Sequence, residues 1–338
     1  MTTLQMNLKI TRMRKTHLTD IAVHNQIRAE LERAKRIVIS AHIRPDGDAV
    51  GSMLGLAQAL REQGKVVQTV LQDAVDPKYF GLAGAEEVQT SIQEPYDYLI
   101  VVDSADRHRV GKVLDGIDEV DLVIDHHISH VNFGKIDVVE PDMEATALVL
   151  YEFMPLWGLP LSNQSAECIM TGILADTIGF RTSNTSPKSL RAVADMMDMG
   201  INLSEIYFQT LSSRTMAELR YWAQGLTKIK YEDGLVWSVL TLEDRAISGY
   251  QANDDADLVN QLSSMQGASM AILFNEQPGE SVKISWRAVP GIDVSTLASS
   301  FGGGGHTAAA GADVPGSLDD VMREVLMRSK AYLQNMIR

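Results

Sequence analysis

The chain lacks several features that would place it in a specialised class of protein. It has a single cysteine, Cys168, which excludes an internal disulfide and a cysteine-rich structural zinc site. Cys168 lies among apolar residues in a helical pattern and is interpreted as part of a core. No apolar segment has the length of a membrane-spanning helix or follows the basic N-terminal stretch as a signal would. A cytoplasmic protein with no membrane partner is predicted.

Positive charge is also scarce. The 30 Lys and Arg residues are outnumbered by 44 Asp and Glu, which gives a net charge of -14. A long polyanion approaching this surface would meet repulsion, so no long duplex is expected as a partner. A short single-stranded oligonucleotide or a small nucleotide remains compatible, because bound divalent cations would invert the field locally. A homodimer is an open possibility.

Apolar residues make up 45% of the 338 residues, which is enough for more than one hydrophobic core. Residues 20–200 are predicted to form an α/β domain with a doubly wound parallel sheet. Residues 201–230, with one long helix over 204–228, are predicted as a helical linker, and 231–338 as a smaller α+β domain. The first domain is predicted from short β-rich runs separated by helical stretches, at 36–40, 66–71, 98–102, 122–124 and 136–139.

Acidic residues and histidines follow three of these apolar runs. They occur in the string from His42 to Asp48, at Asp103 after Val101-Val102, and in Asp125-His126-His127. Parallel sheets place ligands beyond the carboxyl ends of their strands, where these side chains would converge. A carboxylate between two cations can bridge them, and Asp103 is the candidate bridge. The sequence therefore predicts a two-metal hydrolytic centre.

The donor types indicate which metal to expect. Carboxylates mixed with imidazoles suit Mn²⁺ better than Mg²⁺ or Ca²⁺, which prefer oxygen donors. Two Mn²⁺ ions are expected, with Mg²⁺ or Co²⁺ as other divalent candidates.

A second group of candidate residues lies near the C-terminus. Four glycines, Gly302 to Gly305, allow backbone N–H groups to approach an anion, and His306 adds a side-chain donor. In the run 282–287, alternation places Lys283, Ser285 and Arg287 on one face of a strand. Arg287 could bind a phosphate with its guanidinium fork.

Taken together, these motifs resemble the DHH phosphoesterase family with its DHH-associated C-terminal domain. The match runs from His42-x-x-Pro45-Asp46-Gly47-Asp48 through Asp103 and Asp125-His126-His127 to Gly302–His306. Within the family, the two-domain, RecJ-like branch of nano-RNases and pAp phosphatases fits best.

The resemblance implies a set of residue roles. One metal would be held by His42, Asp46 and Asp103, and the second by Asp48, Asp103, His126 and Asp176. Asp125 would orient an imidazole and His127 would reach the scissile phosphate. The implied substrate-binding residues are Arg181, Arg287, Gly303, Gly304, Gly305 and His306.

Alternatives remain open at this point. The substrate could be short RNA or DNA, a linear dinucleotide, cyclic di-AMP or 3′-phosphoadenosine 5′-phosphate, because phosphate-binding loops look alike whatever base is attached. Asp46-Gly47-Asp48-Ala49-Val50 also fits the motif of haloacid-dehalogenase-like phosphatases. A non-catalytic nucleotide-binding module is the remaining alternative, and its signature would be an incomplete ligand set.

Overall fold

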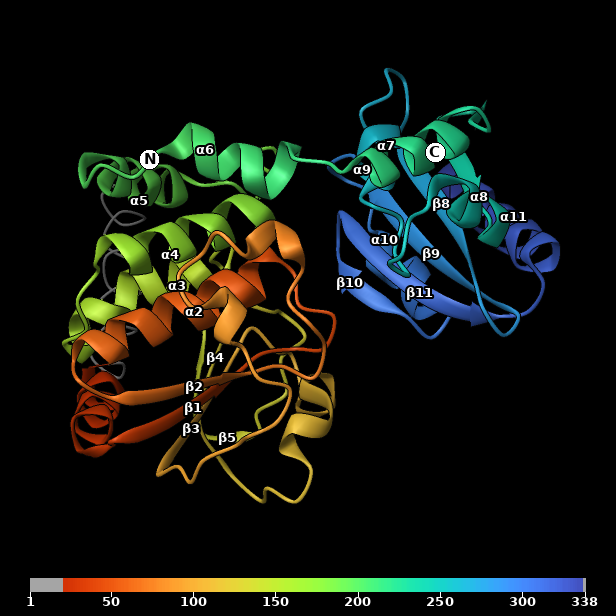
Figure 1. The fold of residues 1–338 in the computed structure, drawn as a ribbon. Coiled ribbons are helices and arrows are strands. Elements are labelled where there is room, and N and C mark those ends of the chain that lie inside the picture. The colour runs from red at the N-terminus through yellow and green to blue at the C-terminus, as the bar shows by residue number, and fades with distance from the viewer. Residues whose placement is uncertain (1–20, 337–338) are drawn as a thin grey trace, which may run out of the picture. The chain divides into compact units, whose positions relative to one another are not determined.

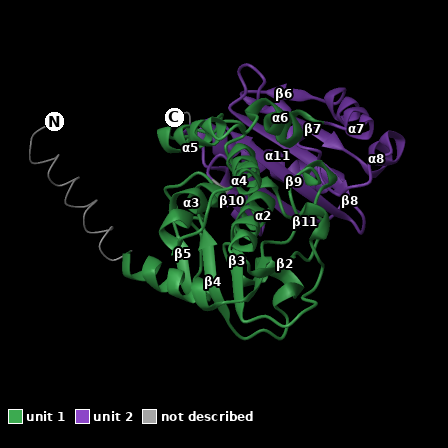
Figure 2. Cartoon of the chain, turned by 60° about the vertical axis from the view of Figure 1, so that its left-hand side comes forward, with its two compact units in different colours: residues 1–213 green, residues 214–338 purple. Residues whose placement is uncertain are grey.

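The computed structural model describes residues 21–336 (Figure 1). The N-terminal stretch in which no signal segment is predicted lies outside the described residues. The chain divides into two compact units, unit 1 up to Ser213 and unit 2 from Arg214 (Figure 2). Within the described part of the chain, no helix combines the length and apolar character needed to cross a membrane.

Unit 1 is built on a five-stranded sheet in which every pair is parallel. Its order is β2-β1-β3-β4-β5, so the chain runs outward in both directions from β1 and the topological switch point lies between β1 and β3. The predicted parallel α/β fold is confirmed. The strands are β1 Arg36–Ser40, β2 Val66–Val70, β3 Tyr98–Val102, β4 Val120–Asp125 and β5 Gly134–Val139.

Helices cover one face of this sheet and make the larger core (Figure 1). A helical segment over residues 21–33 packs into the same core. The other helices on this side are α2 Gly47–Glu62, α3 Thr146–Phe153, α4 Asn163–Asp176 and α5 Pro187–Asp198. The opposite face packs against the 3₁₀ segment Arg107–Leu114 in a smaller apolar cluster. Cys168 is fully buried on α4, as interpreted from the sequence.

Close packing of α2 against α4 depends on glycine. A Cβ at Gly51 would lie 2.4 Å from the carbonyl oxygen of Cys168, and one at Gly172 would lie 2.7 Å from Asp48 Oδ1. Only glycine tolerates such an approach. The first turn of α2, which carries Asp48, and the last residue of α4, Asp176, are thereby held in helices that touch along their length.

The prediction of a single helix over 204–228 is wrong. The segment forms α6 Leu203–Tyr207, a π-helical stretch Phe208–Ser212 and then a separate helix, α7 Met216–Leu226. Ser213 is extended, and Thr215 begins α7 with a reciprocal capping box to Glu218. A threonine side chain that caps a new helix competes with continuation of the preceding helix, so the helix breaks here. The amphipathic pattern of apolar residues nevertheless continues on both sides of the break.

Unit 2 contains a mixed sheet in the order β10-β11-β9-β8-β7-β6, in which only the β7–β8 pair is parallel. Apolar clusters lie on both faces. The strands are β6 Lys230–Glu232, β7 Leu235–Leu240, β8 Met270–Gln277, β9 Ser281–Ala288, β10 Gly304–His306 and β11 Ala309–Pro315. The remaining helices are α8 Leu242–Ser248, α9 Leu258–Leu262, α10 Val294–Ser299 and α11 Leu318–Met336.

Candidate metal and active site

The first candidate ligands stand in the loop that joins β1 to α2. Asp46 is the N-cap of α2, and its side chain accepts hydrogen bonds from the backbone N–H groups of Asp48 and Ala49, each at 3.0 Å. His42 is buried, and its Nδ1 lies 2.8 Å from the carbonyl oxygen of Ile43. A ring nitrogen that faces a carbonyl must donate, which leaves Nε2 as the nitrogen that could bind a cation. His42 Nε2 lies 3.7 Å from Asp46 Oδ1.

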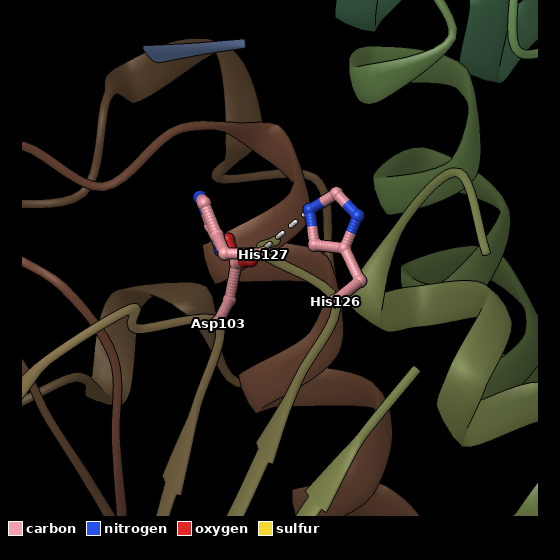
Figure 3. Close-up of side chains that lie close together, drawn as sticks. All are labelled: Asp103, His126 and His127. Carbon is pink, nitrogen blue, oxygen red and sulfur yellow. Dashed lines mark ion pairs between the residues drawn. The ribbon is translucent and has the colours of Figure 1, made fainter. Parts of the chain in front are cut away.

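Asp103 lies between two groups of candidate ligands. It follows β3 directly, and its backbone N–H donates to the carbonyl of Ile124 in β4 at 2.8 Å. Its Oδ2 is 3.4 Å from His42 Nε2, whereas its Oδ1 is 3.7 Å from His126 Nε2 (Figure 3). The Thr146 hydroxyl donates to Oδ1 at 2.9 Å and holds the carboxylate in this rotation. Its two oxygens therefore face different ligand groups, as a bridging carboxylate requires.

The second group gathers around His126, which follows β4. Its Nδ1 lies 3.2 Å from the carbonyl oxygen of Met143, which orients the ring. Its Nε2 lies 3.2 Å from Asp176 Oδ2 and 3.9 Å from Asp48 Oδ2. Asp48 stands in the first turn of α2, and Asp176 is the last residue of α4. Helix ends and strand ends thus bring candidate ligands to one place.

Two triplets have donor atoms within 4.8 Å of one another, as one metal ion requires: His42 with Asp46 and Asp103, and Asp48 with His126 and Asp176. A third triplet joins Asp103 to both histidines that follow β4. The three triplets contain all six residues that the family resemblance implies as metal ligands. Asp103 occurs with His42 and Asp46 and with His126, but the triplet of Asp48, His126 and Asp176 does not include it. The carboxylate and imidazole donors fit divalent cations.

Electrostatics in the site also favour a cation. Burial raises the pKa of Asp48 well above its usual value, and the negative charges of Asp103 and Asp176 raise it further. Burial and the charges of Asp46 and Asp103 likewise raise the pKa of Asp176. Burial alone would lower the pKa of His42, but Asp103 and Asp46 outweigh burial and raise it well above its usual value. Crowded carboxylates of this kind are stabilised as anions by a bound divalent metal.

Asp125 holds the second histidine of the motif. It is fully buried, and its Oδ1 lies 2.7 Å from His127 Nδ1 and accepts the backbone N–H of His126 at 2.8 Å. Figure 3 shows His126 and His127 beside Asp103, and the centroids of the two rings lie 4.8 Å apart. The Nδ1 atom of His127 is 3.8 Å from Asp103 Oδ1. Asp125 thus contacts His127 and belongs to none of the three metal-binding triplets, and its role as the residue that orients an imidazole stays a prediction.

Comparison with known proteins decides the family. The model of the DHH family N-terminal domain matches residues 36–173, and that of the DHHA1 domain matches residues 245–335. A bifunctional oligoribonuclease and PAP phosphatase NrnA from Thermus thermophilus is 33% identical over 294 residues, 86% of this chain and 88% of that protein. The chain belongs to the DHH family.

Other relatives agree with this assignment. A Bacillus subtilis protein of the same name is 25% identical and is aligned over 82% of this chain and 89% of its own length. The crystal structure of an exopolyphosphatase-related protein from Bacteroides fragilis superposes with a TM-score of 0.83 at 25% identity, covering 93% of this chain and 98% of that one. The resemblance drawn from the motifs is confirmed. The haloacid-dehalogenase alternative is set aside, since residues 41–45 separate Asp46 from β1.

In the DHHA1 domain, the alternation predicted for 282–287 is present in β9. Val282, Ile284 and Trp286 are fully buried, and Arg287 lies on the opposite face with Lys283 and Ser285. Arg287 Nε donates to Asn260 Oδ1 at 2.8 Å, and its Nη1 donates to the carbonyl of Trp286 at 2.9 Å. Asn260, on α9, therefore orients Arg287. Sequence analysis missed it, because an asparagine in a short helix carries no distinguishing pattern.

The glycines before His306 have different structural roles. A Cβ at Gly303 would lie 2.1 Å from the carbonyl oxygen of Gly311, and one at Gly305 would lie 2.5 Å from that of Ala309, so both permit β10 to approach β11. A Cβ at Gly304 meets nothing within 4 Å. Of these three, Gly304 is the position that has open space where a Cβ would stand. The side chain of His306 lies outside the described part of the chain.

Arg181 lies in the turn that follows α4, and its side chain is exposed. Its backbone N–H donates to the carbonyl of Thr177 at 2.8 Å. Between them, Ile178, Gly179 and Phe180 adopt φ values of 48°, 64° and 68°, a left-handed run that is unfavourable for the two non-glycine residues. This strained turn directly follows the candidate ligand Asp176 and determines where the chain presents Arg181.

Proposed function

We propose that this protein is a two-metal phosphoesterase that hydrolyses short oligonucleotides or dinucleotides, and 3′-phosphoadenosine 5′-phosphate. The observation that carries the proposal is the pair of ligand triplets, with Asp103 facing the imidazoles of both. The names of the Thermus and Bacillus relatives support the choice of substrate. A complete ligand set argues against a non-catalytic nucleotide-binding module.

Two Mn²⁺ ions are the proposed cofactors. His42, Asp46 and Asp103 would hold one, and Asp48, Asp103, His126 and Asp176 the other. Each site would then include one imidazole nitrogen, which Mn²⁺ accepts more readily than Mg²⁺, and Co²⁺ shares this preference. When bound, such a pair supplies an activated water and neutralises phosphoryl charge.

The chain's own residues perform the remaining tasks. His127, oriented through Nδ1 by Asp125, is assigned to the scissile phosphate, where a positioned imidazole stabilises negative charge. Arg287, oriented by Asn260, is assigned to a substrate phosphate together with Gly303, Gly304, Gly305 and His306. Arg181 is assigned a further substrate contact. Each of the two domains thus contains residues that we assign to substrate binding.

Substrate length is the second part of the proposal. With a net charge of -14, the chain offers little positive field to attract an extended strand, so affinity must come from local groups. The proposed partners are therefore short single strands and small nucleotides, without long duplexes. The single cysteine, buried in the core, suits the cytoplasm, which we propose as the location. A homodimer is the proposed alternative to a monomer.

The test is a substrate panel with purified protein and Mn²⁺, followed by product identification. The panel contains di- to pentanucleotides of RNA and DNA, a long single strand, pGpG-type linear dinucleotides, cyclic di-AMP and 3′-phosphoadenosine 5′-phosphate at one salt concentration. We expect turnover of the short linear substrates and of 3′-phosphoadenosine 5′-phosphate. Equal rates on a dinucleotide and a long strand would contradict the length preference. Turnover of none, with metal bound, would contradict the function.

A further inference from the structure

Asp125 has a third partner that the DHH motif does not contain. Its Oδ1 is occupied by His127 Nδ1 and the backbone N–H of His126, whereas its Oδ2 lies 2.6 Å from Nδ1 of His130. The side chain of His130 is only 3% exposed. A buried carboxylate needs donors on both oxygens, and His130 supplies the donor on the side away from His127.

The other ring nitrogen of His130 also contacts a carboxylate. Its Nε2 lies 3.1 Å from Asp137 Oδ1 on β5, and the same oxygen accepts the backbone N–H groups of Phe133 and Gly134 at 3.2 and 3.3 Å. Both ring nitrogens of His130 therefore face carboxylate oxygens, so both act as donors. Asp125 and Asp137 lie on neighbouring strands, which pair in register through Asp125 and Val139.

Four side chains thus form one hydrogen-bonded series from β5 to the reactive histidine: Asp137, His130, Asp125 and His127. Its last link determines the chemistry of His127, because a carboxylate at Nδ1 selects the tautomer and fixes the ring plane. A carboxylate anchored by one oxygen alone could rotate about its Cβ–Cγ bond. The contact from His130 removes that freedom.

We propose that His130 is a positioning residue, which locks the Asp125 carboxylate and thereby holds His127 in the tautomer and orientation required at the scissile phosphate. This inference rests on the proposed phosphoesterase function. The competing role for His130 is structural, in which its bond to Asp137 merely ties the segment 126–134 to β5.

Amide substitutions separate the two roles. Asparagine at 130 places an N–H donor near the position of Nδ1, and so preserves the contact with Asp125 and loses the contact with Asp137. Glutamine places its donor near Nε2 and does the reverse. We expect His130→Asn to keep kcat within about threefold of the parent, and His130→Gln to lower kcat about ten- to a hundredfold with KM and bound metal unchanged, the usual effect of removing an outer partner.

A second readout follows the tautomer of His127 directly. ¹⁵N NMR of the Mg²⁺-loaded protein should show protonated Nδ1 for His127 in the parent, in His130→Asn and in Asp137→Asn, and a tautomer mixture in His130→Gln. If His130→Gln does not fold, the other two variants decide. The proposal is overturned if His130→Asn loses as much kcat, or as much of the His127 Nδ1 protonation signal, as His130→Gln does. It is also overturned if His130→Gln keeps the parental His127 signal. A parent without turnover but with the expected NMR pattern refutes the enzymatic function alone.

Discussion

The carboxylate of Asp48 caps a helix that begins 98 residues later, because its Oδ2 accepts the backbone N–H of Thr146 at 2.6 Å. Its Oδ1 accepts the N–H of Ala147 at 2.9 Å. The N-cap residue of α3, Ala145, has no side chain that could do this. A candidate metal ligand therefore also satisfies the first donors of α3 and joins α2 to it.

This double role predicts a difference between Asp48→Asn and Asp176→Asn. An asparagine at 48 has one acceptor oxygen for two backbone donors, and a buried unsatisfied donor costs about 1–3 kcal/mol. The Asp176 change removes a repelling charge from the cluster and should leave the metal-free protein at least as stable as the parent. In urea denaturation with chelator present, the free energy of unfolding of Asp48→Asn should therefore be lower than that of Asp176→Asn by about 1 kcal/mol or more. Equal denaturation midpoints would contradict the capping role.

At Asp103, asparagine and alanine should separate chemistry from backbone conformation. Asp103 has a φ of 55°, a conformation that asparagine adopts more readily than other non-glycine residues. We expect Asp103→Asn to abolish Mn²⁺-dependent turnover with near-parental Tm, because loss of one charge weakens both metal sites. Asp103→Ala should lose activity and also unfold at lower temperature. Undiminished turnover by Asp103→Asn after chelation and Mn²⁺ restoration would refute the bridging assignment.

The stability of the metal-free protein should fall as pH rises through neutrality. The pKa values of His42 and His126 are raised in the fold, the carboxylates outweighing the opposing effect of burial. Groups with raised folded pKa values contribute their full stability below the unfolded value, about 6.5, and lose it as pH rises through the folded value. Tm of chelated protein measured from pH 6 upward tests this decline.

Metal binding should show the opposite trend over the same pH range. The two imidazoles must release protons before Nε2 can bind a cation, so Mn²⁺ affinity should increase with pH. Calorimetric titration in buffers of different ionisation enthalpy measures the protons released. Affinity that is independent of pH near neutrality would exclude His42 and His126 as ligands.

His306→Ala should weaken substrate capture far more than metal binding. Loss of a charge-assisted phosphate contact costs about 1.5–3 kcal/mol, which corresponds to about ten- to a hundredfold in kcat/KM. Metal stoichiometry should not change, and a minimal substrate that lacks the second phosphate should be affected much less. An equal loss on both substrates, or loss of bound metal, would place His306 in the catalytic centre.

Among the glycines, Gly304→Ala isolates the anion-binding role of the backbone. Its Cβ has open space around it, so the variant should fold like the parent and show a raised KM if phosphate approaches this N–H. Gly303→Ala is the matched control, because its Cβ would collide with the β11 backbone and lower Tm. Parental kinetics in Gly304→Ala would show that this backbone does not contact substrate.

The order of elements was predictable from local patterns. The apolar runs at 36–40 and 98–102 became β1 and β3 with unchanged bounds, and in a parallel sheet the residues that follow such runs must share one edge. This rule alone was sufficient to predict that His42, Asp103 and His126 lie close together. The break at Ser213 was not predictable from amphipathic period, because the pattern of apolar residues is the same whether one helix or two carry it.

Contacts distant in sequence required the tertiary structure. The sequence by itself determined the donor types, their places after strands and the family to which they belong. Only the fold decided that Asp48 caps α3, that His130 braces Asp125 from β5 and that Asn260 orients Arg287. Local patterns report backbone conformation and which face is buried, whereas these contacts join side chains whose separation is set by how helices and strands pack together.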